Sequence, residues 1–129
     1  MTIQFDQNRP IYLQLMEYFY GKICRFELEA GDKLPSVRET AVEVGVNPNT
    51  VSRTYMEMER EKVVISKRGQ GTFVTEDQQM INELRERTAE KHIDAFLTVM
   101  IQNGFNEEEI MELIQKQLRI INKGGRENE

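Results

Sequence analysis

Three local patterns predict an α+β, mainly helical fold, in which an N-terminal winged helix-turn-helix precedes a two-helix C-terminal region. The first is a pair of short helices, over about 36–44 and 47–61, separated by a tight turn. The second is a hairpin over 63–74 with a basic, glycine-bearing tip. The third is a pair of amphipathic helices after residue 76. We therefore expect one domain over residues 1–75 and a helical dimerisation region over residues 76–129 that ends in a loose tail.

The start of the chain predicts an extended arm followed by one helix. Ile3 and Phe5 alternate with polar residues, which is typical of a short strand or extended arm. Pro10 is well suited to the first turn of a helix. The apolar residues that follow recur at helical spacing: Ile11, Leu15, Tyr18/Phe19, Ile23 and Phe26. Cys24, the single cysteine, cannot form an internal disulfide, and we expect it to act as a small hydrophobe rather than a reactive thiol.

The centre of the chain carries the start and stop signals of two short helices. Ser36 and Glu39 have the spacing of a capping box. Gly45 stands where a helix C-cap requires positive φ. Asn47 is a good N-cap residue, and Pro48 is a good first helical residue. Two helices joined by so short a glycine-containing turn predict a helix-turn-helix.

A hairpin is predicted directly after the second of these helices. Val63–Ile65 and Thr72–Val74 read as strands, and the segment Arg68-Gly69-Gln70-Gly71 lies between them. The glycines permit the turn, and Lys67 and Arg68 place positive charge at or near its tip. Because a two-stranded hairpin is marginal alone, we expect this wing to pack on the helices.

Two helices are expected after residue 76. A long, imperfect apolar stripe runs from Ile81 to Met100, and a second one runs from Ile110 to Ile121. Asn106 between them is an N-cap residue with three glutamates in the following turn. Residues 123–129 read as a loose tail. The helices are expected either to form a hairpin within the monomer or, as we favour, to pair two copies, because helix-turn-helix proteins use dimer symmetry to read two half-sites.

The net charge of −5 argues at face value against a nucleic-acid partner. Residues 1–75 hold 10 basic and 10 acidic side chains, whereas residues 76–129 hold 7 and 12. Residues 33–75 alone hold 7 basic and 5 acidic side chains, a local excess of +2. DNA affinity depends on a local face, so this composition permits DNA binding. No apolar run approaches the ~20 residues of a membrane span, and no secretion leader is apparent, so we expect a cytoplasmic protein that does not enter a membrane.

Catalytic and metal sites have little support in the sequence. His92 is the only histidine, no cysteine lies near it, and its spacing to Asp94 puts the two on different helical faces. The segment Gly69-Gln70-Gly71 lacks the Gly-Lys-Ser/Thr ending of a phosphate-binding loop. We therefore expect no enzyme activity, no catalytic residue, no metal site and no cofactor.

Three arginines stand where a winged helix-turn-helix would meet one duplex: Arg38, Arg53 and Arg68. Each alone is typical of a solvated surface, and their joint placement is what favours DNA. Arg53 is suited to a base edge such as that of guanine, and the wing cations are suited to a minor groove or to phosphate. Ser36 and Arg38 are suited to positioning a phosphate. The complete candidate set for DNA binding is Ser36, Arg38, Asn47, Asn49, Thr50, Arg53, Lys67, Arg68, Gly69 and Gln70.

Several motifs in order resemble the GntR family of bacterial transcription regulators. They are Leu34-Pro35-Ser36-Val37-Arg38-Glu39, Gly45-Val46, Thr50-Val51-Ser52-Arg53 and Gly69-Gln70-Gly71-Thr72-Phe73-Val74, together with the opening Ile3-Gln4-Phe5-Asp6 and Pro10-Ile11-Tyr12-Leu13-Gln14. The segment from Asn47 to Tyr55 and the short C-terminal part resemble the YtrA subfamily. The family resemblance covers about residues 3–75.

The resemblance implies a homodimeric winged-helix repressor that binds a pseudo-palindromic, double-stranded DNA operator. It implies a C-terminal region too small for the ligand domains of larger relatives, and whether a small-molecule effector exists is left open. The alternative is a protein-interaction module of the antirepressor type, because a winged fold does not fix function. Two residues depart from the family pattern, because Phe26 and Lys62 stand where the family often has glycine. At Lys62, either the residue adopts the left-handed geometry at some cost or the helix ends differently.

Overall fold

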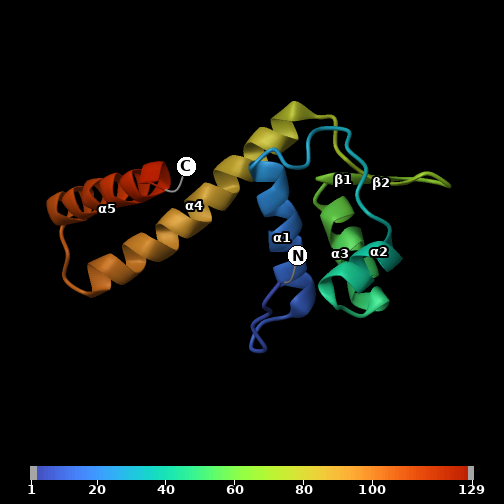
Figure 1. The fold of residues 1–129 in the computed structure, drawn as a ribbon, viewed down its shortest axis with the longest axis horizontal. Helices are drawn as coiled ribbons and strands as arrows, with labels where there is room; N and C mark the ends of the chain where they lie inside the picture. The colour runs from blue at the N-terminus through green and yellow to red at the C-terminus, as the bar shows by residue number, and fades with distance from the viewer. Residues whose placement is uncertain (1–2, 128–129) are drawn as a thin grey trace. The chain divides into compact units, whose positions relative to one another are not determined.

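The computed structural model describes residues 3–127 of the chain. Five helices and one hairpin follow each other along these residues (Figure 1). Their bounds are α1 Ile11–Cys24, α2 Val37–Val44, α3 Pro48–Arg60, β1 Val64–Lys67, β2 Gly71–Val74, α4 Gln78–Gln102 and α5 Glu107–Glu127. The predicted fold class, a winged helix-turn-helix followed by C-terminal helices, is confirmed. Two compact units are present, Met1–Arg87 and Thr88–Glu129, and each is described by itself.

The N-terminal arm is held by Gln14 of α1. The backbone N–H of Asp6 donates to Gln14 Oε1 at 2.7 Å. The Gln14 amide donates in turn to the carbonyl oxygens of Asp6, at 2.7 Å, and Arg9, at 3.0 Å. Residues 3–6 form no strand, so the alternative of an extended arm is the one observed. Gln14 is itself buried, which makes this clamp part of the fold rather than a surface contact.

Helix α1 buries the apolar stripe expected of it, except for the last member. Leu15, Phe19 and Ile23 are buried. Phe26 lies beyond the helix end, has φ 62° and is 51% exposed. The prediction that Phe26 belongs to the helical stripe is therefore wrong, because Phe26 occupies the left-handed position that closes the helix, a conformation that favours glycine.

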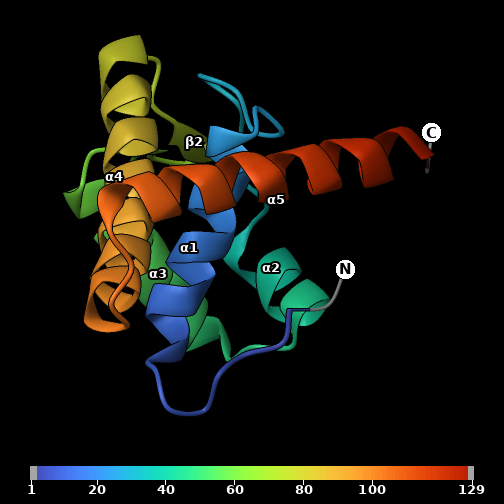
Figure 2. The ribbon, with the colours of Figure 1, turned by 90° about the vertical axis from the view of Figure 1, so that its left-hand side faces the viewer.

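Helices α2 and α3 are capped as the sequence predicts. Ser36 and Glu39 form a capping box at the start of α2, and Gly45 closes α2 with φ 70°. Asn47 caps α3, with Pro48 in its first turn. Helix α3 packs against both α1 and α2 and leads directly into β1 (Figures 1 and 2). The chain thus holds α3 from two sides and leaves its remaining face open to solvent.

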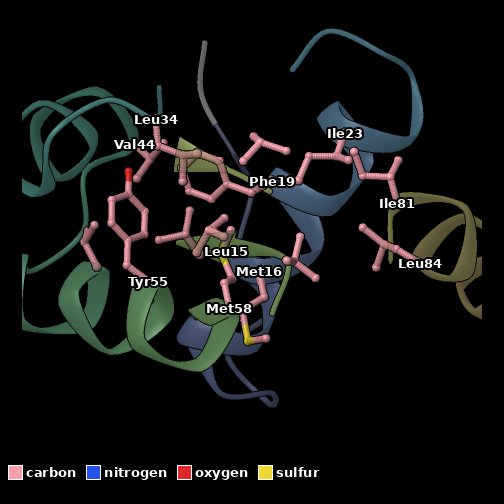
Figure 3. Close-up of a cluster of buried hydrophobic side chains, with 14 of the residues drawn as sticks. Leu15, Met16, Phe19, Ile23, Leu34, Val44, Tyr55, Met58, Ile81 and Leu84 are labelled. Atoms are coloured by element: carbon pink, nitrogen blue, oxygen red, sulfur yellow. The ribbon is translucent and has the colours of Figure 1, made fainter. Parts of the chain in front are cut away.

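A single apolar core lies under these helices. Tyr55 of α3 contacts Phe19 of α1 edge to face, with ring centroids 5.6 Å apart. Ile81 and Leu84 reach into the same core from the first turns of α4 and lie beside Ile23 (Figure 3). For this reason the first compact unit extends to Arg87, beyond the boundary expected at residue 75.

The wing is longer than predicted and has a third paired segment. Strands β1 and β2 are antiparallel, with Val64 opposite Val74 and Lys67 opposite Gly71. β1 starts one residue later than predicted, and both strands continue one or two residues further toward the tip. On its other edge, β2 pairs with the segment before α2: the N–H of Leu34 donates to Thr72 O, and that of Val74 donates to Asp32 O, both at 2.8 Å. The wing is therefore fixed to the start of α2.

The second unit contains the C-terminal part of α4 and all of α5. Asn106 and Glu109 cap α5 reciprocally, with N–H to side-chain oxygen distances of 2.9 and 3.0 Å. The predicted loose tail over 123–129 is wrong for the residues that are described, because α5 continues to Glu127. Gly124 has helical backbone here rather than the positive φ of a helix C-cap. Within residues 3–127, no helix is both long and apolar enough to cross a bilayer.

Candidate nucleic-acid interface

The open face of α3 carries the residues expected to meet a base edge. Val51, Thr54, Tyr55 and Met58 are buried, which directs Asn49 and Arg53 to solvent. Thr50 and Ser52 are half-buried beside them. Asn47 plays another part, because its side-chain oxygen accepts the N–H of Asn49 at 2.8 Å. Asn47 therefore caps the helix, and its carbonyl oxygen is engaged within the protein.

The start of α2 presents Arg38 beside the capping box. Ser36 Oγ accepts the N–H of Glu39 at 3.1 Å, and Glu39 Oε1 accepts the N–H of Ser36 at 3.0 Å. The hydrogen bond that the Glu39 carboxylate accepts from the Ser36 backbone, followed by its interaction with the Ser36 side chain, holds the pKa of the Glu39 carboxyl below its usual range. Arg38 is exposed on the first turn of α2.

The wing tip is formed by Arg68, Gly69 and Gln70, all exposed. The N–H of Gln70 donates to Lys67 O at 2.9 Å, and Gly69 supplies φ 75°. The Lys67 ammonium lies 4.7 Å from the centre of the Phe73 ring. The four wing residues singled out in the sequence are thus brought together at one end of the hairpin.

Lys33 adds a further cation on the wing that sequence reasoning missed. It pairs with Phe73 across an isolated bridge. Its side chain lies against Gly71, where an added Cβ would stand 2.8 Å from Lys33 Cε. The glycine at position 71 is the sequence signal of this contact, because a residue with a Cβ would collide there. The sequence does not reveal that Lys33, 38 positions earlier, occupies the volume beside it.

The arginines of the first unit fall into two groups. Five are engaged by the protein: Arg9 with Glu17, Arg25 with Glu27, Arg60 with Glu57, Arg87 with Glu61, and Arg85 with the carbonyl oxygen of Cys24. In the part of the chain that the structure describes, Arg38, Arg53 and Arg68 have no carboxylate within 4.0 Å and donate no side-chain hydrogen bond. The three arginines selected from the sequence are the ones whose donors are available to a ligand.

Arg53 differs from the other two in having a support. Its guanidinium carbon lies 3.8 Å from the centre of the Tyr12 ring, on the first turn of α1. Guanidinium groups stack on aromatic faces while their N–H donors point outward in the plane. Arg53 is therefore held by its face and free at its edge.

Candidate metal ligands are His, Cys, Asp and Glu side chains. Among the described residues, no group of three or more His, Cys, Asp and Glu side chains is arranged to hold a metal ion. His92 is exposed on α4, and Cys24 is half-buried as a free thiol.

A capped helix-turn-helix, a fixed wing and unpaired cations on both define the winged helix-turn-helix class of DNA-binding proteins. Comparison with known proteins agrees with this class. The family model described as bacterial regulatory proteins, gntR family, matches residues 11–74. The chain belongs to this family and is a DNA-binding helix-turn-helix transcription regulator.

Relatives match the chain over nearly its whole length. The HTH-type transcriptional regulator YhcF of Bacillus subtilis is 44% identical, and the match covers 89% of this chain and 95% of YhcF. The HTH-type transcriptional repressor YtrA of the same organism is 34% identical, over 98% of this chain and 99% of YtrA. A solved GntR family regulator from Listeria monocytogenes is 38% identical, with TM-score 0.84 and coverage of 87% of this chain and 98% of that one. The similarity to the YtrA subfamily is thereby confirmed.

Proposed function

We propose that the protein is a cytoplasmic, homodimeric repressor that binds a pseudo-palindromic DNA operator. The observation that carries the proposal is the availability of Arg38, Arg53 and Arg68 on three elements of one winged helix-turn-helix, while the other arginines of that unit are engaged. Repression is supported by the similarity to YtrA, which is named a repressor.

Different roles are proposed for the residues of this surface. Arg53 reads a base edge in the major groove, with Asn49 and Thr50 beside it on the N-terminal turns of α3. Ser36 and Arg38 position a backbone phosphate at the start of α2. The wing residues Lys67, Arg68, Gly69 and Gln70 lie along the backbone or enter the minor groove. Asn47 caps α3 through its side-chain oxygen, and its exposed side-chain N–H donors are proposed to contact DNA beside Asn49.

A second copy of the chain is the proposed partner of the second unit. Ten large apolar side chains there are at least 37% exposed: Ile93, Phe96, Val99, Ile101, Phe105, Met111, Leu113, Leu118, Ile120 and Ile121. A monomeric protein rarely exposes so many apolar groups on one short region. Their burial between two copies is worth roughly 1.5–3 kcal/mol for each side chain that becomes fully covered. Dimer symmetry would also supply the two half-sites that the operator proposal requires.

Selection of bound duplexes from a random DNA pool tests the function directly. We expect the full chain to enrich a motif with two inverted half-sites. Arg53→Ala should weaken binding of that motif and relax its base preference. Arg38→Ala should weaken all sequences alike and reduce the slope of log affinity against log salt by about one. Arg60→Ala is the matched control, because Arg60 lies on the same helix but is paired with Glu57.

The dimer is tested by light scattering on the full chain and on Ile121→Glu. Ile121 is 63% exposed, so the substitution should leave the first unit folded while placing a charge in the proposed interface. The expected outcome is a dimer for the wild type and a monomer with weak operator binding for the variant. A monomeric wild type that still binds an inverted repeat tightly would contradict the proposed partner. Specific protein binding with no enriched duplex would favour the interaction-module alternative.

Repression is tested in cells with a reporter fused to the enriched duplex. Expression of the wild-type chain should lower reporter output, and Arg53→Ala should restore it. Higher output with the wild-type chain would show activation and contradict repression, while leaving the DNA-binding proposal intact.

A further inference from the structure

The stack between Tyr12 and Arg53 gives the opening motif of the chain a role at the DNA surface. The Arg53 guanidinium lies 3.8 Å from the centre of the Tyr12 ring. Tyr12 belongs to the first turn of α1 and Arg53 to the open face of α3, 41 residues later. A long, exposed arginine on a helix otherwise samples many rotamers, and binding must select one of them.

Tyr12 is a fixed platform because the residues around it are fixed. Leu15, one turn along α1, is fully buried in the core. Gln14 anchors the preceding arm through its three hydrogen bonds to Asp6 and Arg9. Tyr12 itself is half-buried against the core cluster. The ring can therefore hold Arg53 in one orientation without moving with it.

The stack leaves Arg53 competent to bind. Cation–π contact uses the face of the guanidinium plane, whereas hydrogen bonds to a base or phosphate use its edge. Among the described residues, no protein acceptor takes the Arg53 donors. Arg38 and Arg68 have no aromatic ring beside them within the same part of the chain. Among the three arginines whose donors are available, Arg53 is thus the one that an aromatic ring supports in the described part of the chain.

We propose that Tyr12 is a positioning residue that orients Arg53 for base recognition in the operator. This inference rests on the proposed function, because it requires Arg53 to contact DNA. Base recognition demands a fixed geometry for a bidentate contact, whereas phosphate contacts tolerate mobile side chains. The support is thus present at the arginine where orientation matters most.

A double-mutant cycle on the full chain tests the coupling, with the duplex enriched from the random pool as probe. Tyr12→Leu removes the ring and should weaken binding about two- to fivefold, the range of an exposed cation–π contact. Tyr12→Phe keeps the ring and should restore wild-type affinity. In an Arg53→Ala background, Tyr12→Leu should have no further effect. Tyr20→Leu is the matched control, because Tyr20 also lies on α1 but bonds Glu61 at the far end of α3.

Two readouts separate positioning from general support of the fold. A duplex altered at the base pair on which Arg53 depends should be bound equally by the wild type and Tyr12→Leu. In NMR spectra of the free protein, the side-chain protons of Arg53 should show an upfield ring-current shift that Tyr12→Phe preserves and Tyr12→Leu abolishes. Circular dichroism checks that each variant is folded, and the shift in the wild type remains informative if Tyr12→Leu does not fold.

Each contrary outcome overturns a distinct statement. If Tyr12→Leu lowers the affinity for the duplex equally with and without Arg53, Tyr12 acts independently of Arg53. If Tyr12→Phe lowers the affinity, the Tyr12 hydroxyl contacts DNA. Either result refutes the positioning role. Unchanged binding by Arg53→Ala refutes the coupling while leaving a DNA-binding protein. Failure of the wild type to enrich any duplex refutes the proposed function, and the ring-current shift then still reports whether the stack forms.

Discussion

Replacing Lys62 by glycine should stabilise the protein, although it removes a side chain. Lys62 follows the end of α3 with φ 66°, a conformation that disfavours any residue with a Cβ. The N–H of the next residue, Val63, reaches back to Met58 O at 3.1 Å, so the turn is a Schellman motif with a lysine in the glycine position. Lys62 is exposed, and truncating it removes no buried contact.

The expected gain is the difference between two backbone terms. A Cβ in the left-handed region costs about 1–2 kcal/mol, and glycine returns that amount. Glycine also widens the unfolded ensemble, which offsets about 0.4–1 kcal/mol. Lys62→Gly should therefore raise the free energy of unfolding by about 0.5–1 kcal/mol.

The end of α2 provides the mirror experiment. Gly45 closes the same kind of motif with φ 70°, and the N–H of Val46 donates to Ala41 O at 3.0 Å. A Cβ added at Gly45 meets no atom within 4 Å, so Gly45→Ala measures the backbone effect alone. It should destabilise by about the amount that Lys62→Gly gains. At Phe26, which lies in the third such motif, glycine would also remove the ring that stacks on Arg85, so the gain there should be smaller.

Urea unfolding of the full chain, followed by circular dichroism, measures these differences. Protein concentration must be fixed, because dimer formation would make apparent stability concentration-dependent. If Lys62→Gly and Gly45→Ala change stability in the same direction, the left-handed strain is not what distinguishes the two helix ends.

Four further predictions concern buried and capping groups of the first unit. Ser36→Ala should lower the free energy of unfolding by about 1 kcal/mol through loss of the N-cap, measured by urea unfolding. The pKa of Glu39 is depressed in the folded protein, so its ionised carboxylate should contribute to the free energy of unfolding at any pH above the ordinary Glu pKa of about 4.3. This contribution should be lost as the pH falls through the pKa of Glu39 in the folded protein. An NMR titration, with Glu39→Gln for comparison, checks this. Tyr55→Phe should destabilise by about 1–3 kcal/mol, because its hydroxyl bonds Pro35 O at 2.7 Å and Thr40 at 2.8 Å. Burial raises the pKa of Tyr55 to about 12. The neutral hydroxyl should therefore contribute its full share to the free energy of unfolding below pH ~10, and this share should be lost as the pH rises from ~10 to about 12. Unfolding measured across this alkaline range checks the loss.

The helix ends show how far local rules reach. The capping box at Ser36, the N-cap at Asn47 and the left-handed Gly45 all follow from residue type at fixed spacing, and all three are observed. At Lys62 the sequence presented two alternatives, and the strained one is realised because the Schellman bond and the start of β1 fix the chain on both sides.

What the sequence could not provide is contact between distant segments. Ile81 and Leu84 fit a helical stripe, but nothing local says that they complete the core of the preceding domain. The stack of Tyr12 on Arg53 and the packing of Lys33 against Gly71 depend on how helices and strands meet in space. The sequence did not predict that α5 continues through Gly124, because glycine commonly ends a helix by adopting positive φ. The residue type alone does not show whether a given glycine has positive or helical φ.

The arginine partners also explain why net charge is a poor guide to the proposed DNA surface. Residues 1–87 hold 12 basic and 14 acidic side chains, so the first unit is slightly acidic. Five of its arginines are engaged within the protein, and the remaining Arg38, Arg53 and Arg68 lie on α2, α3 and the wing. Engagement at the other sites leaves the available guanidinium groups of this unit on the elements of the winged helix-turn-helix. Three such groups from one copy support only a modest electrostatic affinity for DNA. Doubling them in a dimer should double the slope of log affinity against log salt concentration. The affinity for the operator should therefore depend on pairing of two copies through the second unit.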